Sequence, residues 1–354
     1  MKKYVASCFL VFISIALAAA PASATILFAG GEDLDFTGNG SAISVSTSTG
    51  FNSTYSRESV YSTYQNGSYY IVTPVFTSSS TFWVHFDYLG TSFYNNPLYW
   101  IALLDSSGIP RIYIETTHNM GNNVTSGVTI NKANAAGTVT LLATSAGTVY
   151  ITPESTVDLY VNYGASGTIT LYQNGAPIVT YSGDVTTDGN TALAQLWLGA
   201  NTYNQTYYSQ VIVSTLDSRA MHLATIPPAA NGNTMAWTGT VGNINATSYN
   251  DSNVISSATS GQLAEFTASA LPTGSYSIAA VVQSARASAT VGGIQNLQFD
   301  TRTGGTSYQS ANQTLSPGMS HYAYIWSTNP NTGVAWTTSD LGAAGFNLGV
   351  ESQT

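Results

Sequence analysis

Hydrophobic and polar residues alternate along this chain in short runs, and clusters of Gly, Asn, Ser and Thr separate the runs. In the run 81–88, Phe82, Val84 and Phe86 would share one face of an extended segment, while Trp83 and His85 would share the other. This period of two with frequent turn residues is typical of antiparallel β-sandwiches. It predicts strands at 26–28, 69–75, 81–88, 99–104, 111–115, 138–142, 157–163, 193–198, 210–213, 262–267, 274–284, 294–301, 321–327 and 346–350. No stretch has the pattern of an amphipathic helix of about three turns, so the sequence predicts a nearly all-β protein.

The clearest local element is a hairpin at 167–181. Two alternating segments flank Asn174-Gly175, and this dipeptide accepts the positive backbone angles of a tight two-residue turn. Near the C-terminus, the polar run 337–340 has the composition of a capped helical turn. Both features are compatible with a β-sandwich.

A joint between two domains is expected where the strand at 210–213 gives way to Pro227-Pro228 and then to small and polar residues. Proline lacks the amide donor that a β-ladder needs, so a double proline should end the ladder. The sequence therefore predicts a first β-sandwich at 25–226, a linker at 227–233 and a C-terminal β-sandwich module at 234–354.

The first 24 residues have the pattern of a secretory signal peptide. Lys2 and Lys3 precede an apolar run at 5–19, and Ala22-Ser23-Ala24 is a small-residue cleavage motif. The alternative is an uncleaved N-terminal anchor. Cleavage would leave 354 − 24 = 330 residues without Cys8, the single cysteine, and without a segment apolar enough to span a membrane. The expected location is periplasmic, extracellular or on the cell surface.

Charge narrows the range of partners. The chain has 8 Lys and Arg against 17 Asp and Glu, and charged residues make up only 7% of it. Such a chain lacks the basic surface that binds phosphate backbones, so nucleic acid is not expected as a partner.

Several segments together resemble a known fold family. The strings TITLYQNGAPIVTYSG (168–183), LAQLWLGAN (193–201) and SQVIVSTLD (209–217) resemble the closing strands of concanavalin A-like, laminin-G-like jelly rolls. The opening ILFAGGEDLDF (26–36) and the ending NPNTGVAWTTSDLGAAGFNLGVE (329–351) are similar to uncharacterised phage and prophage proteins. Those proteins pair such a sandwich with a C-terminal β module and are regarded as structural. A secretory signal departs from that phage pattern.

The resemblance directs attention to carboxylates, because concanavalin-like glucanases place them at alternate strand positions. Asp33 and Asp35 would share a strand face, but a third carboxylate at that spacing is missing, and a solvated turn or cation site is the alternative. The chain has no Gly-x-Ser-x-Gly motif, and its four histidines are scattered. The sequence therefore predicts that the protein is not an enzyme.

A calcium site is predicted in the loop after the hairpin. Asp184, Asp188 and Asn190 bring two carboxylates and an amide into one turn, and calcium prefers such oxygen ligands. The resemblance supports this, since laminin-G-like domains often hold calcium in their loops. The alternative is a turn whose side chains bond their own backbone.

A ligand surface is predicted between two strands, at Tyr203, Tyr207 and Tyr208 with Asn201 and Asn204. Tyrosine rings offer flat faces to sugars, and neighbouring amides can bond hydroxyl groups. The alternative is that these rings are ordinary partners within the sheet. Tyr99 and Trp100 form a second aromatic candidate, whereas four tryptophans are expected in the core: Trp197, Trp237, Trp326 and Trp336.

The sequence thus favours an exported, non-catalytic protein that binds a glycan or a cell-surface polymer through its first domain. One alternative is a structural subunit that associates with itself or with another protein in an extracellular or phage-derived assembly. A polysaccharide-degrading enzyme is the third hypothesis.

Overall fold

The computed structural model describes residues 12–14, 16–17, 25–38, 43–46, 59–62, 69–90, 98–117, 124–125, 127–146, 149–150, 154–200, 206–246, 248–289 and 293–354. The chain divides into two compact units. The N-terminal unit holds residues 25–221, and the C-terminal unit holds residues 222–354 together with 1–24. The division lies a few residues before the predicted joint.

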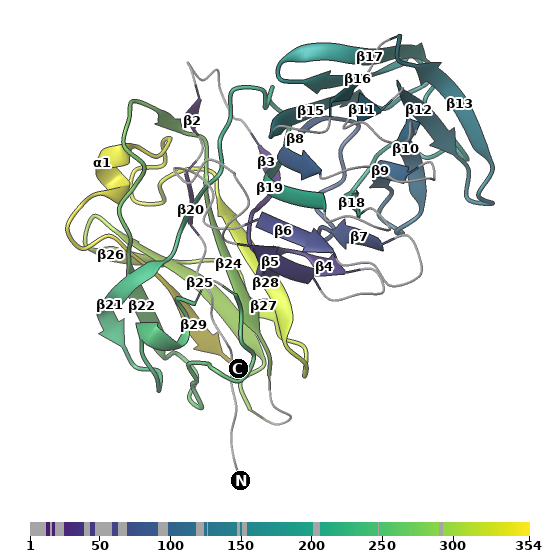
Figure 1. Cartoon of the computed structure of the whole chain (residues 1–354). Coiled ribbons are helices and arrows are strands. Elements are labelled where there is room, and N and C mark those ends of the chain that lie inside the picture. Colours follow the sequence, from purple (N-terminus) through teal and green to yellow (C-terminus); the bar gives the residue numbers. More distant parts are fainter. Residues whose placement is uncertain are drawn as a thin grey trace. The chain divides into compact units, whose positions relative to one another are not determined.

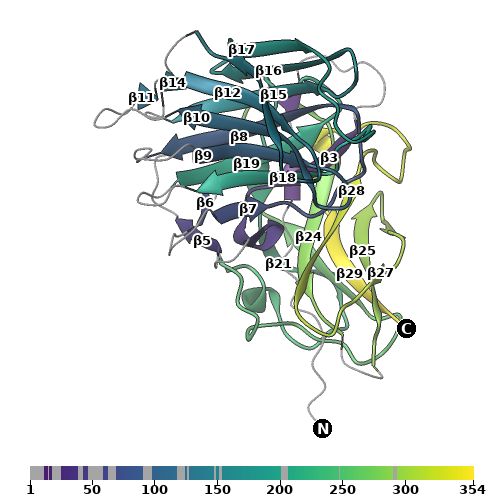
Figure 2. The same cartoon turned by 90° about the vertical axis from the view of Figure 1, so that its right-hand side faces the viewer.

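Two large antiparallel sheets make up most of the N-terminal unit (Figures 1 and 2). The seven-stranded sheet has the order β13 (Val139–Thr144), β12 (Gly127–Ala133), β10 (Pro110–Thr117), β9 (Leu98–Leu104), β18 (Gln195–Ala200), β7 (Tyr69–Val72) and β4 (Thr37–Gly38). The eight-stranded sheet has the order β17 (Ala176–Gly183), β16 (Gly167–Gln173), β15 (Ser155–Asn162), β8 (Thr81–Gly90), β19 (Thr206–Ser214), β6 (Ser59–Ser62) and β5 (Ile43–Ser46), with β3 (Ile26–Gly30) also beside β19. A small sheet pairs β11 (Val124–Thr125) with β14 (Val149–Tyr150).

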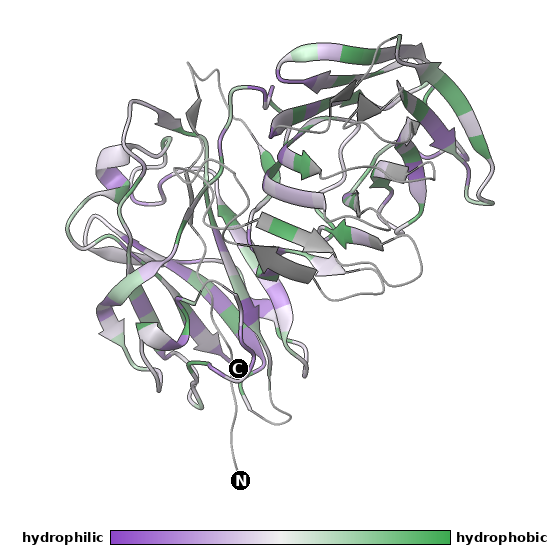
Figure 3. Ribbon diagram, in the orientation of Figure 1, coloured by the Kyte–Doolittle hydropathy of each residue, from purple (hydrophilic) through white to green (hydrophobic). Residues whose placement is uncertain are grey.

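The core of this unit lies between the two sheets. Phe82, Val84 and Phe86 of β8 are fully buried, as the alternation predicts, and Phe86 contacts Trp100 of the opposite sheet edge to face at 6.1 Å. Hydrophobic and hydrophilic residues alternate in colour along such strands in Figure 3. Burial of one face of each sheet explains why the period-two pattern located most of the strands.

The predicted hairpin is confirmed. β16 and β17 pair across Asn174 and Gly175, whose φ values of 51° and 78° belong to the left-handed region. Asparagine and glycine tolerate that region best, which is why this dipeptide fixes the turn. The strand β12 was not predicted, because Gly127–Ala133 carries few large apolar residues.

The C-terminal unit is also antiparallel β. Its main sheet has the order β21 (Pro228–Met235), β22 (Leu263–Ala268), β29 (Asn347–Gln353), β25 (Asn296–Thr303) and β26 (Thr306–Gln309), with β27 (Gln313–Thr314) beside β25. Three further pairs are β24 (Val281–Ala287) with β28 (Ser320–Trp326), β20 (Ala224–Ile226) with β1 (Phe12–Ser14), and β23 (Ser277–Ile278) with β2 (Ala16–Leu17). The core joins Phe266, Phe299 and Leu348 of the main sheet to Val281 and Trp326 of the β24–β28 pair.

The segment expected to be a linker is instead the strand β21, which pairs with β22. It is an edge strand that begins at Pro228. A proline is tolerated there because no strand on the outer side of the edge needs the amide donor that proline lacks. Helical structure is short in the described ranges: the 3₁₀ turns η1 (Asp33–Asp35) and η2 (Val241–Asn243), and α1 (Thr338–Leu341). Thr337 caps α1, as predicted.

The fold class is therefore confirmed as all-β with jelly-roll sandwich architecture. Among the residues that the structure describes, no helix is both long enough and apolar enough to cross a membrane.

Candidate functional site

The outer face of the seven-stranded sheet carries a row of aromatic and polar side chains. Tyr113 alternates with the buried Ile112 and Ile114, so its ring lies on the side away from the core. Register places Tyr113 opposite Asn131 of β12 on one side and Ala102 of β9 on the other. Ala102 in turn lies opposite Trp197 of β18, so four neighbouring strands contribute to one row.

Glu115 lies beside this row, two residues beyond Tyr113 on β10. Its Oε2 accepts hydrogen bonds from Asn131 Nδ2 at 2.9 Å and from Thr129 Oγ1 at 3.4 Å. Partial burial raises the pKa of Glu115, although the hydrogen bonds from Thr129 and Asn131 act to lower it. Within the described chain its Oε1 has no donor and is not enclosed, so a ligand hydroxyl can reach it.

One partly exposed ring, that of Trp197, extends the face on its other side and packs against the buried Tyr70. Trp197 alternates with the buried Leu196 and Leu198, and its ring lies 4.9 Å from that of Tyr70, centroid to centroid. The prediction that Trp197 belongs to the core is wrong, whereas Trp237, Trp326 and Trp336 are core residues as predicted. Trp197 is only partly buried, so it leaves an indole surface available.

At the opposite end of the row, Leu141 of the edge strand β13 lies opposite Asn131 and is 59% exposed. The face therefore runs from an exposed leucine, past a phenol and a carboxylate that the buried Asn131 holds, to a partly exposed indole. Such a surface can place flat apolar groups against a sugar ring while polar groups bond its hydroxyls.

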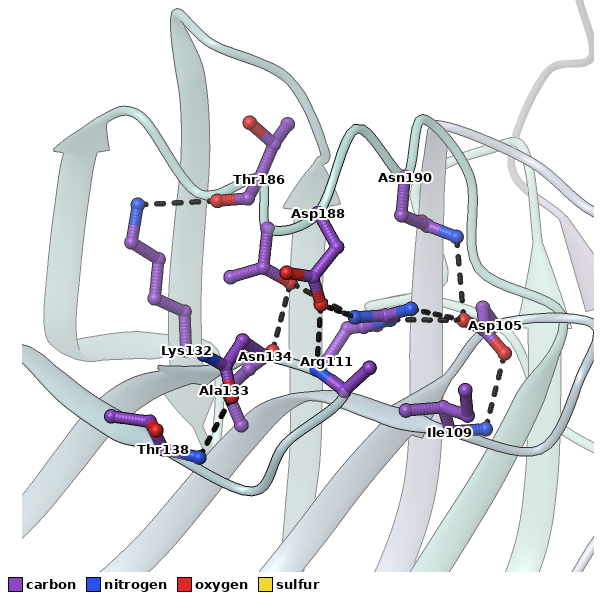
Figure 4. A network of polar contacts seen from close by, with 12 residues as sticks. Asp105, Ile109, Arg111, Lys132, Ala133, Asn134, Thr138, Thr186, Asp188 and Asn190 are labelled. Carbon is purple, nitrogen blue, oxygen red and sulfur yellow. Dashed lines mark hydrogen bonds and ion pairs between the residues drawn. The ribbon is translucent and has the colours of Figure 1, made fainter.

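A network of ion pairs lies at one end of this sheet (Figure 4). Arg111 of β10 holds Asp105 at 2.8 Å and Asp188 at 2.5 Å, and both Arg111 and Asp105 have side chains only 7% exposed. Burial acts to raise the pKa of Asp105, but the hydrogen bonds from Ile109 N and Arg111 outweigh it and leave that pKa lowered. The hydrogen bond from Ala135 N and the Arg111 contacts lower the pKa of Asp188.

The predicted calcium ligands lie in this network, but each contacts a different protein group. Lys132 Nζ lies 3.0 Å from Asp184 Oδ2, and Asn190 Nδ2 lies 3.5 Å from Asp105 Oδ2. Hydrogen bonds from Thr186, followed by that from Lys132, lower the pKa of Asp184 to about 2. The described residues contain no group of three or more His, Cys, Asp or Glu side chains arranged to hold a metal ion. Calcium binding here stays a prediction, and it would require Asp184 and Asp188 to leave their cationic partners.

The predicted tyrosine surface is divided. Tyr208 is fully buried, donates to Gly199 O at 2.5 Å and contacts the ring of Phe86, so it is a core residue. Tyr207 is also buried, at 8% exposure. These two positions are corrections to the prediction, and the reason is that β19 passes through the middle of the eight-stranded sheet. The other three residues lie outside the described residues: Asn201, Tyr203 and Asn204.

The carboxylate candidates also differ from expectation. Asp33 and Asp35 lie in the turn η1 rather than on one strand face, and Asp35 Oδ2 accepts from the backbone N–H groups of Gly31 and Glu32 at 3.0 Å. Of the second aromatic pair, Trp100 is fully buried. These side chains organise the fold locally and present no open face.

One histidine lies in a polar cluster on the outer face of the eight-stranded sheet. His85 Nδ1 lies 2.9 Å from Asp158 Oδ1, and Ser218 Oγ donates to that same oxygen at 3.0 Å. A nucleophilic serine must reach the imidazole base, yet Ser218 bonds the aspartate instead. The cluster therefore does not have the order of a hydrolytic triad.

Sequence reasoning missed Glu115 and Asn131, although a signal was present. Tyr113-x-Glu115 and Thr129-x-Asn131 each put two polar or aromatic groups on one strand face, and neither segment forms a turn. The register that brings the two pairs together depends on long-range pairing of β10 with β12.

No family model matches the chain, and no curated protein matches it in sequence. Among solved structures, it is similar to an endo-β-1,4-glucuronan lyase from Trichoderma reesei, with 14% identity, 56% of this chain and 98% of that chain covered, and a TM-score of 0.41. It is also similar to a Bacillus subtilis protein of galectin-like fold, with 11% identity, 56% and 97% coverage and a TM-score of 0.37. A third similar structure is a carbohydrate esterase of the Shiga toxin-encoding bacteriophage phi24B, with 10% identity, 55% and 100% coverage and a TM-score of 0.34. At these identities the likeness concerns the fold, and no residue role is transferred.

The prediction that the chain is not an enzyme is contradicted by this comparison. A lyase and an esterase are among the sandwich proteins of similar fold, so the fold gives no ground for a non-catalytic assignment.

Proposed function

We propose that this is an exported carbohydrate-binding protein whose ligand lies on the outer face of the seven-stranded sheet. The observation that carries the proposal is that the exposed Leu141 and the partly exposed Tyr113 and Trp197 lie on one face of the sheet. The accessible oxygen of Glu115 lies beside them, and the buried Asn131 holds that carboxylate in place. Aromatic surface beside a carboxylate is a composition that recognises sugars. A row across several strands suits an extended polysaccharide better than a single sugar.

The electrostatics of this face favour an uncharged glycan. Glu115 places a carboxylate on it, and the nearby cations Arg111 and Lys132 are paired with Asp105, Asp188 and Asp184. The net charge, −9 for the full chain and −9 − 2 = −11 without Lys2 and Lys3, adds long-range repulsion of anionic polymers at low salt.

Binding is tested by affinity electrophoresis of the chain from residue 25 in gels that contain neutral or uronate polysaccharides. We expect retardation by at least one neutral polysaccharide, with weaker retardation by uronate polymers. If every gel leaves the mobility unchanged, the proposal is refuted.

Glu115 also provides a group that can transfer a proton, because its pKa is raised and one oxygen is accessible. Each retarding polysaccharide is therefore incubated with wild type and with Glu115→Gln, and new chain ends are measured. Cleavage by wild type that Glu115→Gln abolishes would place an enzymatic reaction on this face. Cleavage that survives Glu115→Gln would exclude Glu115 from that reaction.

A second candidate function, assembly, rests on the edge strand β13. Val139 and Leu141 are 42% and 59% exposed on a strand whose outer edge is unpaired in the described sheet. Exposed apolar edges pair readily with other chains. Light scattering of wild type and Leu141→Lys over a wide concentration range tests this hypothesis. A smaller molecular mass for Leu141→Lys than for wild type supports assembly through β13. A wild type that is monomeric at every concentration excludes it.

A further inference from the structure

The C-terminal unit contains a cavity that the proposed binding face does not involve. It has a volume of about 330 Å³ and lies between the β25–β26 turn, the chain that follows α1, and β21. Pockets for small ligands usually measure ~300–1,000 Å³, so the cavity is large enough for one compact molecule. Its lining residues are Asn233, Arg302, Thr303, Gly304, Gly305, Asp340, Ala343, Ala344, Gly345 and Phe346.

Arg302 is the main hydrogen-bond donor of this cavity. Its Nη1 donates to Ser307 Oγ at 3.4 Å and lies 3.9 Å from Glu265 Oε1. A guanidinium group has five N–H donors. Apart from the donor bonded to Ser307, those of Arg302 have no acceptor within the described chain. Arg302 is therefore positioned by the sheet beneath it while most of its donors remain available.

An acceptor and an amide complete the polar lining. Asp340 uses Oδ2 to accept from Thr337 N at 2.8 Å and from Thr337 Oγ1 at 2.7 Å. Its Oδ1 has no donor among the described residues, and the side-chain amide of Asn233 has no partner there either. Both side chains can therefore bond a ligand without breaking an existing contact.

The remaining wall is apolar and backbone. Phe346 is 5% exposed and is fixed by an edge-to-face contact with Trp336 at 6.0 Å. Gly304 and Gly305 form the two-residue turn between Thr303 and Thr306, with φ values of 59° and 84°. A Cβ on Gly304 would lie 2.5 Å from Asn331 Nδ2, so a side chain there would have to displace Asn331 and adopt a strained positive φ.

The charges around the cavity argue against an anionic ligand. The positive charge of Arg302 faces Glu265, which is fully buried, and Asp340 contributes a second carboxylate at the wall. A ligand carboxylate or phosphate would meet no net positive field. A ligand with several hydroxyl groups and no charge would use the donors of Arg302 and Asn233, the acceptor of Asp340 and the ring of Phe346.

We propose that this cavity binds an uncharged monosaccharide, or the uncharged terminal sugar of a glycan, with Arg302 and Asp340 bonding its hydroxyl groups. The site belongs to the C-terminal unit and does not depend on the proposed role of the seven-stranded sheet.

Saturation-transfer NMR on the full chain tests the proposal with D-glucose, D-galactose and D-mannose, and with D-glucuronate as the charged counterpart. We expect saturable binding of at least one neutral hexose and weaker binding of glucuronate. Arg302→Gln removes the donor fork and should weaken binding by about tenfold or more, as expected for hydrogen bonds to a charged group.

Two further variants separate ligand contact from folding. Ala344→Leu fills the cavity from an exposed position and should weaken binding to a similar extent without changing the thermal midpoint. The control Arg286→Gln removes an arginine that pairs with Asp251 elsewhere in the same unit, and binding should be unchanged. Failure of all three hexoses to bind, or equal binding by wild type and Ala344→Leu, would overturn the proposal. Persistence of hexose binding in Trp197→Ala would separate this site from the sheet face.

Discussion

Replacement of Asp300 by asparagine should change the pH dependence of stability in the C-terminal unit. Asp300 lies opposite Gly349, and Gly349 lies opposite Glu265, so the two acidic residues occupy alternate strands of one row. Both are fully buried, and Asp300 Oδ2 and Glu265 Oε2 have no partner among the described residues. Burial, followed by repulsion from Glu265, raises the pKa of Asp300 to about 7.

The direction follows from proton linkage. As the pH rises, Asp300 in the unfolded chain loses its proton near pH 4, the ordinary pKa of an aspartate. In the folded chain Asp300 keeps its proton until about pH 7. Between these values the unfolded state binds fewer protons, so the free energy of unfolding falls by about 1.4 kcal/mol for each pH unit. Below pH 4 the stabilising contribution is complete, and above pH 7 it has been lost. The total change is about 4 kcal/mol.

Asparagine cannot ionise, and its amide oxygen can still accept from Gln309 Nε2, which donates to Asp300 Oδ1 at 2.8 Å. Its amide N–H₂ replaces the carboxyl proton as a donor. Asp300→Asn should therefore gain about 3 kcal/mol relative to wild type as the pH rises from 5 to 8. All other titrating groups are the same in both proteins, so their contributions cancel when the two free energies of unfolding are subtracted at each pH.

Urea unfolding at each pH, followed by hydrogen-exchange mass spectrometry of peptides from β22, β25 and β29, reports this unit specifically. Glu265→Gln removes the neighbouring charge and should give a smaller dependence on pH than wild type. If wild type and Asp300→Asn change in parallel between pH 5 and 8, the reasoning is refuted, because Asp300 would then ionise at its ordinary pH.

Two further predictions concern the N-terminal unit. Arg111→Met leaves the buried Asp105 without its cation, so the free energy of unfolding measured in urea should fall by about 3–5 kcal/mol. Lys132→Met removes the cation of a more exposed pair, so the free energy of unfolding should fall by less than about 1 kcal/mol. Equal losses in the two variants would contradict this account of the network. Gly175→Ala should lower the free energy of unfolding by about 1–2 kcal/mol, because the φ of Gly175 is 78°. The control Gly164→Ala should leave the free energy of unfolding almost unchanged, because its Cβ has open space and its φ is not left-handed. An unchanged free energy in Gly175→Ala would contradict the prediction and show that the turn relaxes.

Sequence reasoning was most successful where the determinants of structure are local. The alternation around Phe82, Val84 and Phe86 located a strand, because one face of each sheet is buried. The Asn174-Gly175 turn was located because few residues accept its backbone angles. The capped turn at Thr337 depended on a hydrogen bond between residues close in sequence.

The candidate site was harder to predict because it is assembled by long-range register. Tyr113, Asn131 and Trp197 become neighbours only through the pairing of β10 with β12 and of β9 with β18. Tyr208 is a residue type that is common in ligand sites, yet it lies on a central strand and is buried. Pro228 was expected to end the sheet, but position at an edge reverses that expectation.

The central claim is that the outer face of the seven-stranded sheet binds a glycan, and a matched pair of tryptophan variants tests it most directly. Trp197 lies on that face, and Trp83 lies on the outer face of the eight-stranded sheet, where its ring contacts Tyr160 and Tyr172. Calorimetric titration with the retarding neutral polysaccharide should show about tenfold or greater loss of affinity for Trp197→Ala and an unchanged affinity for Trp83→Ala. Equal affinity of Trp197→Ala and wild type, or a loss confined to Trp83→Ala, would contradict the assignment of the site.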